Sequence, residues 1–136
     1  MNKKIVSLLL VLIMALSFVS CTDKADVWKD ALYTEDTTLG EGAKTVTVKV
    51  EADERIVVFT VKTDLDNLGA ALLDVKLVEG ENGPYGLYIK RVNGILADYD
   101  VDRHYWSVSK DGIDLMTGTE SEKISGGEHY EITRAK

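Results

Sequence analysis

The chain has 136 residues with 16 basic and 23 acidic side chains, and its formal net charge is −7. An acidic surface repels phosphate groups, so this balance argues against a nucleic-acid partner and against electrostatic docking on anionic lipid. The length suits one domain with a single hydrophobic core.

The first twenty residues have the layout of a secretory signal. A short basic start precedes an apolar stretch over residues 5–19, which is too short and wrongly flanked for a membrane span. The segment FVSC, Phe18–Cys21, resembles the bacterial lipobox, although Phe18 stands where Leu is usual. We therefore expect a signal peptide over residues 1–20 and an extracytoplasmic protein anchored to the bacterial cell membrane surface by a lipid on Cys21. The alternative is a free thiol beside a plain secretory cleavage site.

Cys21 is the only cysteine, so no internal disulfide can form. Removing residues 1–20 leaves 116 residues with 14 basic and 23 acidic side chains, a formal charge of −9. Residues 21–43 hold few apolar residues, several charges and two glycines, which predicts a flexible lipid-anchored tether. Trp28 and Tyr33 interrupt it, and we expect them to lie against the edge of the folded domain.

The folded domain is expected over residues 44–136. Residues 44–51 alternate Val with polar residues, which predicts a half-buried strand, and residues 55–63 predict a second strand of the same hairpin. The period then changes. Apolar residues recur at spacings of three and four along residues 65–75, which predicts a helix, with Thr63 and Asp66 as a capping box at its start.

The second half of the domain is rich in turn signals. Residues 79–86 predict a loop, whereas Asn93-Gly94 and Asp111-Gly112 are strong signals for two-residue hairpin turns. Residues 128–134 alternate again and predict the last strand. This order predicts an α+β domain: a β-grasp-like mixed sheet with one crossing helix, in which the first and last strands lie side by side and parallel.

The window Ala97–Trp106, ADYDVDRHYW, is the densest in groups capable of chemistry. Its three alternating aspartates match the start of an EF-hand calcium loop, but Arg103 stands where Gly is required and Ser109 where Glu is required. Two histidines with no ligand spacing exclude a zinc site. We therefore expect no metal and no cofactor.

Catalysis has little support in the sequence. Asp102, His104 and Ser107 contain the side chains of a triad, but neighbours on one strand point to alternate faces, and no nucleophile elbow is present. We therefore expect that the protein is not an enzyme. If residues 99–106 are extended, aspartates line one face as solvated edge residues.

Aromatic residues suggest a contact face for a ligand. Tyr and Trp combine an apolar body with a polar group and are common in recognition surfaces. We expect Tyr85, Tyr88, Tyr105 and Trp106 to contact a ligand. We expect the turn residues Asn93, Gly94, Asp111 and Gly112 to determine the conformation of the loops on that face.

Four segments together resemble the transcobalamin C-terminal-like domain family. They are TDLDNLGAALLDV, YGLYIKRVNGILADYD, YWSVSKDG and GGEHYEITR. This β-grasp-like module occurs in vertebrate cobalamin carriers and in bacterial surface lipoproteins. The stretch SVSKDG keeps the family's turn but lacks its aromatic residues.

The resemblance implies non-enzymatic binding of a corrinoid such as cobalamin, or of a similar small ligand. In the carriers the module packs over one face of the corrinoid, which is held against a separate helical domain. That domain is missing from this chain, so a helical partner protein is implied. The alternative function is a cell-surface protein–protein interaction module that completes a larger assembly or transporter, with a partner pairing to an exposed strand.

Overall fold

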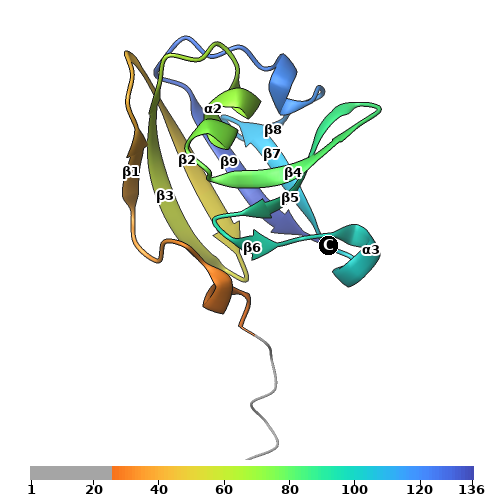
Figure 1. Ribbon diagram of the computed structural model, residues 1–136. Coiled ribbons are helices and arrows are strands. Elements are labelled where there is room, and N and C mark those ends of the chain that lie inside the picture. Colours follow the sequence, from red (N-terminus) through yellow and green to blue (C-terminus); the bar gives the residue numbers. More distant parts are fainter. Residues whose placement is uncertain (1–25) are drawn as a thin grey trace, which may run out of the picture.

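A computed structural model describes residues 26–136, which form an α+β fold of two sheets and four short helices (Figure 1). The spatial order of the large sheet is β1 (Thr37–Gly40), β3 (Arg55–Thr63), β2 (Lys44–Ala52), β9 (His129–Ala135), β7 (Tyr105–Lys110) and β8 (Ile113–Asp114). The small sheet contains β4 (Val78–Gly83), β5 (Gly86–Val92) and β6 (Ile95–Leu96). The helices are η2 (Val27–Asp30), α2 (Leu68–Asp74), α3 (Tyr99–Asp102) and η3 (Thr119–Ser121).

The expected signal peptide over residues 1–20 and the lipid site at Cys21 lie outside the described residues. Within residues 26–136, no helix has the length and apolar character that a bilayer crossing requires.

The hairpin of β2 and β3 is confirmed and forms the centre of the large sheet. Its turn residues Asp53 and Glu54 both have positive φ angles, 48° and 65°, as expected for a two-residue turn that follows the strand twist. Every second residue of β2 is buried, so Val46, Val48 and Val50 form the core face. The last strand is also confirmed as β9, which pairs in parallel with β2 from Thr47 opposite His129 to Glu51 opposite Thr133.

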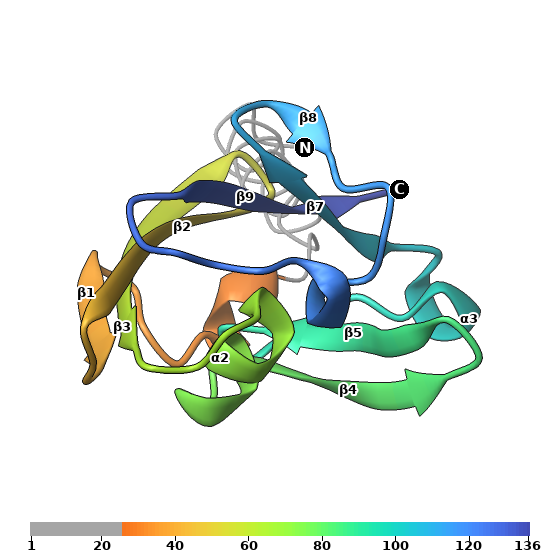
Figure 2. The same ribbon diagram turned by 90° about the horizontal axis from the view of Figure 1, so that it is seen from above.

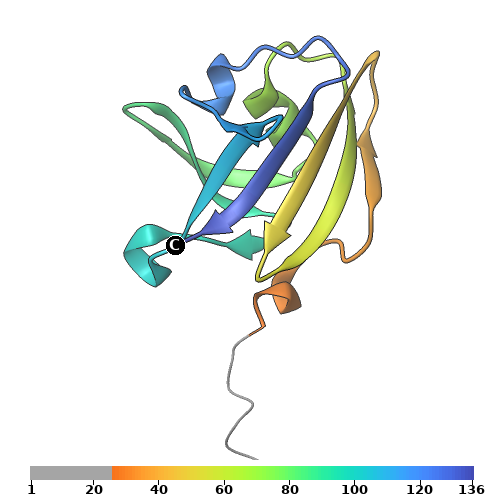
Figure 3. The ribbon, with the colours of Figure 1, turned by 180° about the vertical axis from the view of Figure 1, so that it is seen from behind.

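The core lies between the two sheets, and here the predicted architecture is wrong in part. One helix was expected to cross a single mixed sheet. Instead the small sheet, α2 and η2 together cover the inner face of the large sheet (Figure 2). Among residues 26–136 no second layer of secondary structure covers the outer face (Figure 3), and the residues of β2 on this face are threonine, lysine and glutamate. The large sheet is therefore buried on one face only, in agreement with the alternation of apolar and polar residues along β2.

Helix α2 is confirmed in place but is shorter than the period suggested. Asn67 is its N-cap and accepts a hydrogen bond from the N–H of Ala70, so the predicted capping box is wrong. Thr63 ends β3 and accepts from the N–H of Leu65, while Asp66 pairs with Lys44 at 2.9 Å. Thr63, Asp66 and Asn67 are all residue types that cap helices, and here the side chains of Thr63 and Asp66 have other partners while Asn67 caps α2.

The predicted tether over residues 21–43 is wrong for its described part, residues 26–43. The Trp28 indole is 4% exposed and donates to the carbonyl of Ala52 at 2.8 Å. The Tyr33 ring meets Phe59 edge-on with centroids 5.7 Å apart. Strand β1 then pairs in parallel with β3. The partners of this segment in the domain are 22 or more residues away, which is why its own composition did not reveal its packing.

The predicted loop over residues 79–86 is also wrong. Most of it is β4, which pairs with β5 in a hairpin that turns at Pro84-Tyr85. Two glycines and three polar residues weaken the strand signal, but pairing with the stronger strand β5 supplies the hydrogen bonds. This hairpin projects from the body of the molecule (Figure 1).

The expected extended conformation over residues 99–106 is found only from Tyr105, where β7 begins, and residues 99–102 form a helical turn instead. Asp98 caps α3 by accepting from the N–H of Asp100, and Arg103 ends the helix in the left-handed region, at φ 59°. The polarity of the sequence alternates here, but aspartate is common both at helix N-caps and on exposed strand edges, so the pattern did not distinguish the two conformations. The aspartates therefore do not share one strand face.

Candidate functional site

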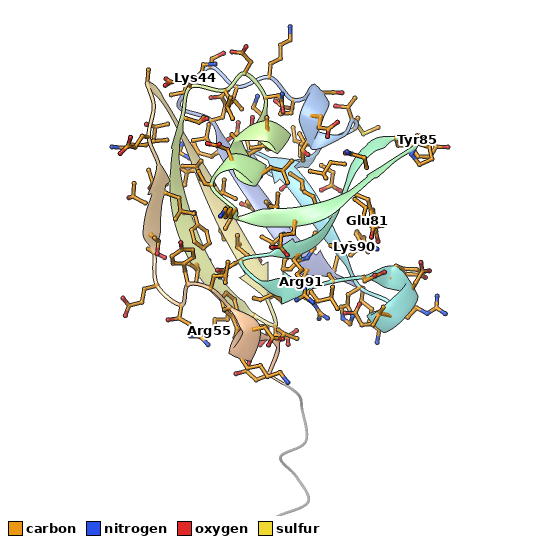
Figure 4. All side chains as sticks on the ribbon, viewed as in Figure 1. Lys44, Arg55, Glu81, Tyr85, Lys90 and Arg91 are labelled. Carbon is orange, nitrogen blue, oxygen red and sulfur yellow. The ribbon has the colours of Figure 1, made fainter. Side chains whose placement is uncertain are left out.

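The projecting hairpin, which we call the arm (β4, Pro84-Tyr85 and β5), is the most distinctive exposed feature of the molecule. At its tip the Tyr85 side chain is 96% exposed (Figure 4). Tyr88 on β5 is 42% exposed, and Tyr105 at the start of β7 is 43% exposed. The arm therefore presents tyrosine rings to solvent on a backbone fixed by strand pairing.

The pleat of the arm separates its side chains onto two faces. Glu81 lies opposite Tyr88 across the hairpin, and Lys90 follows two positions later on the same face. Leu87 and Ile89 belong to the other face. That face packs against the body of the domain, since Ile89 is only 8% exposed. A cleft is associated with each face.

The apolar cleft lies where β5 meets β7. It has a volume of about 220 Å³ and is lined by residues 87–89, Tyr105, Trp106, Val108, Leu115 and residues 117–119. The Trp106 ring is 8% exposed and donates from Nε1 to the carbonyl of Lys90 at 3.2 Å. Trp106 thus closes the core beneath the arm, while Tyr105 stays half-exposed at the rim. Three of the predicted contact residues, Tyr88, Tyr105 and Trp106, come together here.

The acidic cleft lies between the arm and α3. Its volume is about 380 Å³, and it is lined by residues 81–88, Lys90, Asp98 and Asp100. Tyr85 and Tyr88 supply its aromatic surface. The two clefts share Leu87 and Tyr88, so the arm forms a wall of both.

Lys90 is the electrostatic centre of the acidic cleft (Figure 4). Its Nζ lies 3.3 Å from a Glu81 oxygen and 3.4 Å from an Asp98 oxygen, and it lies 6.0 Å from the centroid of the Tyr88 ring. The interaction with Glu81 raises the pKa of Lys90 above its ordinary value; burial opposes this rise and the charge of Asp98 adds to it. The cleft therefore stabilises an ammonium group.

The turn Asn93-Gly94 forms as predicted, with φ angles of 52° and 78°, but Asn93 is structural. Its side chain is fully buried, accepts from the Tyr33 N–H at 2.9 Å and donates to the Tyr33 carbonyl at 2.7 Å. A Cβ at Gly94 would lie 2.4 Å from the Asp30 carbonyl oxygen. The turn therefore holds the N-terminal segment, and its expected part in shaping a ligand face stays a prediction. Gly94 lines a third cleft, with Asp30, Leu32, Lys76, Leu77, Glu79 and Arg91.

The turn Asp111-Gly112 also forms, with φ angles of 51° and 82°. Both residues are exposed at the β7–β8 hairpin, and neither lines the apolar, acidic or third cleft. The predicted site is therefore divided. The structure brings the four aromatic residues to the arm and its base, and it leaves the four turn residues outside both arm clefts.

Asp102 and His104 contact each other and the end of β9. Asp102 pairs with Arg134 at 3.0 Å and accepts from the backbone N–H of His104. The His104 ring bonds through Nδ1 to the Asp102 carbonyl oxygen at 2.7 Å. Within residues 26–136, no group of three or more His, Cys, Asp and Glu side chains has the arrangement of a metal site.

The sequence reasoning missed the set of Glu81, Lys90, Asp98 and Asp100. Glu81 was placed in a loop and Asp98 on a strand edge. The alternation of Tyr88 and Lys90 within one strand was the available signal, because it places a ring and an ammonium on the same face. The carboxylates could be added only once the hairpin register and the helical turn of α3 were known.

No family model and no curated protein matches this chain. Among solved structures, one match is the "putative metal binding protein from Ruminococcus gnavus ATCC 29149", solved at 1.30 Å resolution. It is 35% identical with a TM-score of 0.65, and the match covers 69% of this chain and 98% of that one. Another is haptocorrin in complex with Cbi, at 24% identity and a TM-score of 0.51. That match covers 68% of this chain but only 25% of haptocorrin, and it shows a shared fold alone.

Proposed function

The chain belongs to the same family as the Ruminococcus gnavus protein, and from that premise we propose that it is a non-enzymatic binding module at the outer face of a bacterial membrane. Its ligand is a small molecule of the corrinoid type, received by the arm. The observation that carries this proposal is the arm itself, a strand-paired hairpin that exposes Tyr85 at its tip and Tyr88 beside the apolar cleft at its base. Tyrosine rings fixed in this way lose little entropy when they bind a flat ligand.

The corrinoid class is supported by the shared fold with haptocorrin, which was solved with Cbi, that is, cobinamide. A corrinoid is a broad, flat macrocycle, and clefts of about 220 and 380 Å³ can accept only part of one. The arm would therefore cover one face of the ring, with Tyr85, Tyr88 and Tyr105 in contact and Trp106 supporting them from below. A helical partner protein on a different chain would cover the other face.

A metal ion is the other ligand that the comparisons suggest, and the described residues do not fit one. The carboxylates that line the acidic cleft are Glu81 on the arm and Asp98 and Asp100 at α3, and two of them, Glu81 and Asp98, already pair with the ammonium of Lys90. An ammonium between two carboxylates repels a divalent cation. The proposal therefore includes no metal.

Lipid attachment at Cys21 would hold this domain close to the bilayer. Only five peptide units separate Cys21 from Asp26, where the described fold begins. A chain of that length spans at most about 18 Å, so the domain would stand directly on the membrane rather than at the end of a long tether. The helical partner would then also have to reach the membrane surface.

The test is a titration of a soluble form that begins at Thr22 with cobinamide, followed by the absorbance of the corrinoid and by tryptophan fluorescence. We expect saturable binding that weakens at least about tenfold in a Tyr85→Ala/Tyr88→Ala double variant, as for anchor residues of an interface. Ile56→Ala is the control, because Ile56 is 45% exposed on β3 and lines neither arm cleft nor the third cleft.

Binding that is equal in the double variant and in the control would reject the arm as the site. No spectral change at about 100 μM cobinamide, a concentration that would populate even a weak complex, would reject the corrinoid. Incorporation of labelled palmitate at Cys21 in a bacterial host tests the anchor separately.

A further inference from the structure

The dipeptide Asn-Gly occurs twice in this chain, and the structure places the two copies in opposite environments. Asn82-Gly83 ends β4 near the tip of the arm, and both residues are exposed. Asn93-Gly94 forms the turn between β5 and β6, where Asn93 is fully buried. The same two residues are therefore open to water in one place and enclosed in the other.

An asparagine that precedes a glycine can react with its own backbone. The glycine nitrogen forms a bond to Cγ of the asparagine, the bond from Cγ to the amide nitrogen breaks, and ammonia leaves with the proton of the glycine N–H. Water then opens the resulting cyclic imide at either of its two carbonyl carbons, which gives aspartate or isoaspartate. Glycine favours the ring, because it has no Cβ to crowd the attacking nitrogen and its backbone rotates freely. The reaction consumes only water.

The position of Asn82 in the arm permits this reaction. Strand β4 lies at an edge of the small sheet and pairs with β5 alone. Gly83 is its last residue and lies opposite Gly86, next to the turn at Pro84-Tyr85. The extended backbone must rotate before the Gly83 nitrogen reaches Cγ of Asn82. At the end of an edge strand this rotation costs little, since few hydrogen bonds have to open.

Asn93 is held against the same reaction. Its carboxamide accepts a hydrogen bond from the Tyr33 N–H at 2.9 Å and donates one to the Tyr33 carbonyl at 2.7 Å. The backbone of Gly94 packs on the N-terminal segment, because a Cβ there would lie 2.4 Å from the Asp30 carbonyl oxygen. Rotation at Asn93 would break both hydrogen bonds in a buried site, so it requires local unfolding.

We propose that Asn82 is a modification site at which the arm deamidates spontaneously to aspartate and isoaspartate, whereas Asn93 stays intact in the folded protein. Either product adds a negative charge to the acidic cleft, which Asn82 lines. Isoaspartate also adds a methylene group to the main chain of β4, so Gly83 no longer lies in register with Gly86. The modification therefore loosens the tip of the arm. This inference goes beyond the proposed function, because the reaction needs no ligand.

The experiment incubates the soluble form in warm, mildly alkaline buffer and follows both asparagines by peptide mapping with mass spectrometry. Labelling by an isoaspartyl methyltransferase distinguishes isoaspartate from aspartate. We expect Asn82 to convert at least about tenfold faster than Asn93, because Asn93 reacts only after local unfolding. In guanidinium chloride the two rates should become similar, since the protection of Asn93 is lost. Amide hydrogen exchange of residues 86–88 should accelerate in the isoaspartate fraction.

Gly83→Ala tests the attack by the backbone nitrogen while it keeps Asn82. A Cβ at Gly83 would lie 3.7 Å from the Gly86 carbonyl oxygen, an ordinary contact, so alanine fits the folded arm. We expect the conversion of Asn82 to slow severalfold, because the added methyl group crowds the attacking nitrogen and restricts its backbone. Ile56→Ala, a change at an exposed residue of β3, is the control and should leave the rate as it is.

Four results would overturn the proposal. They are an Asn82 that stays intact while the unfolded chain reacts, equal conversion of Asn82 and Asn93 in the folded protein, a difference between them that persists undiminished in guanidinium chloride, and an unchanged rate in Gly83→Ala. No corrinoid is present in any of these measurements, so their outcome is independent of the proposed function.

Discussion

Residues 26–43 and the arm are both polar segments whose own sequences suggest no regular structure, yet they end in opposite environments. The first sends Trp28 into the core, where it is 4% exposed, whereas the second holds Tyr85 in solvent at 96%. The difference lies in long-range partners. Ala52 and Asn93 supply hydrogen-bonding groups for the first segment, while the tip of the arm pairs only with itself. Whether an aromatic residue in a polar segment is buried or exposed is therefore decided by its contacts with residues distant in the sequence.

This comparison predicts that Trp28→Ala has the largest effect on stability. The substitution removes a buried indole, its hydrogen bond to Ala52 and its contact with the Arg55 guanidinium, which lies 4.9 Å from the ring centroid. We expect the free energy of unfolding to fall by about 3–5 kcal/mol. Chemical denaturation measures it, and a loss below about 1 kcal/mol, the size of a surface change, would mean that residues 26–43 are not packed.

The next largest effect is expected at Asn93. Asn93→Ala leaves the N–H and carbonyl of Tyr33 without their side-chain partner in a buried site. The expected loss is about 2–3 kcal/mol, the cost of buried polar groups that lose their hydrogen bonds. Amide hydrogen exchange should accelerate at Leu32 and Tyr33 well before the β2–β3 hairpin. Uniform acceleration over the whole chain would contradict a local role.

Substitution at the tip of the arm should have little effect on stability. Tyr85→Ala removes an exposed side chain from a turn whose backbone pairing remains. The midpoint of thermal unfolding should stay within the range of an ordinary surface substitution, about 0.5 kcal/mol in free energy. A large drop would show that Tyr85 packs against the domain, and it would remove the reason for assigning it to binding.

The smallest effect concerns acid stability. Burial tends to raise the pKa of Glu128, but hydrogen bonds from the N–H groups of Ser125 and Gly126 outweigh it and hold the pKa below its ordinary value of 4.5. A carboxylate with a lowered pKa in the folded state adds stability above its unfolded pKa, and this contribution is lost as the pH falls through the folded value. Glu128→Gln should therefore flatten the dependence of stability on pH below about 4.5. An unchanged profile would exclude this role.

The strands with clear alternation were predictable from sequence. In β2 and β9 the alternation of apolar and polar residues places one face on the core, and the turns at Asn93-Gly94 and Asp111-Gly112 follow from their residues. The small sheet was not predictable as a second layer, because β4 carries glycines and acidic residues and becomes a strand only through pairing with β5. The conformation of Asp98–Arg103 was missed because a helix cap and a strand edge both favour aspartate.

The candidate site was likewise predictable from the sequence only in part. The sequence suggested the four aromatic residues because tyrosine and tryptophan are common in recognition surfaces, and the structure places them at the arm and its base. The turn signal at Asn93-Gly94 did not reveal that Tyr33 and Asp30 pack behind that turn. The sequence reasoning also missed the carboxylates around Lys90, which come from an adjacent strand and from α3.

The central claim is that the arm binds the ligand while residues 26–43 complete the core. Backbone amide NMR of the soluble form with and without cobinamide tests it most directly. We predict shifts confined to residues 81–90 and to Tyr105 and Trp106 at the base of the arm. Shifts centred on Trp28, on Asn93-Gly94 or on Asp111-Gly112 would contradict that claim.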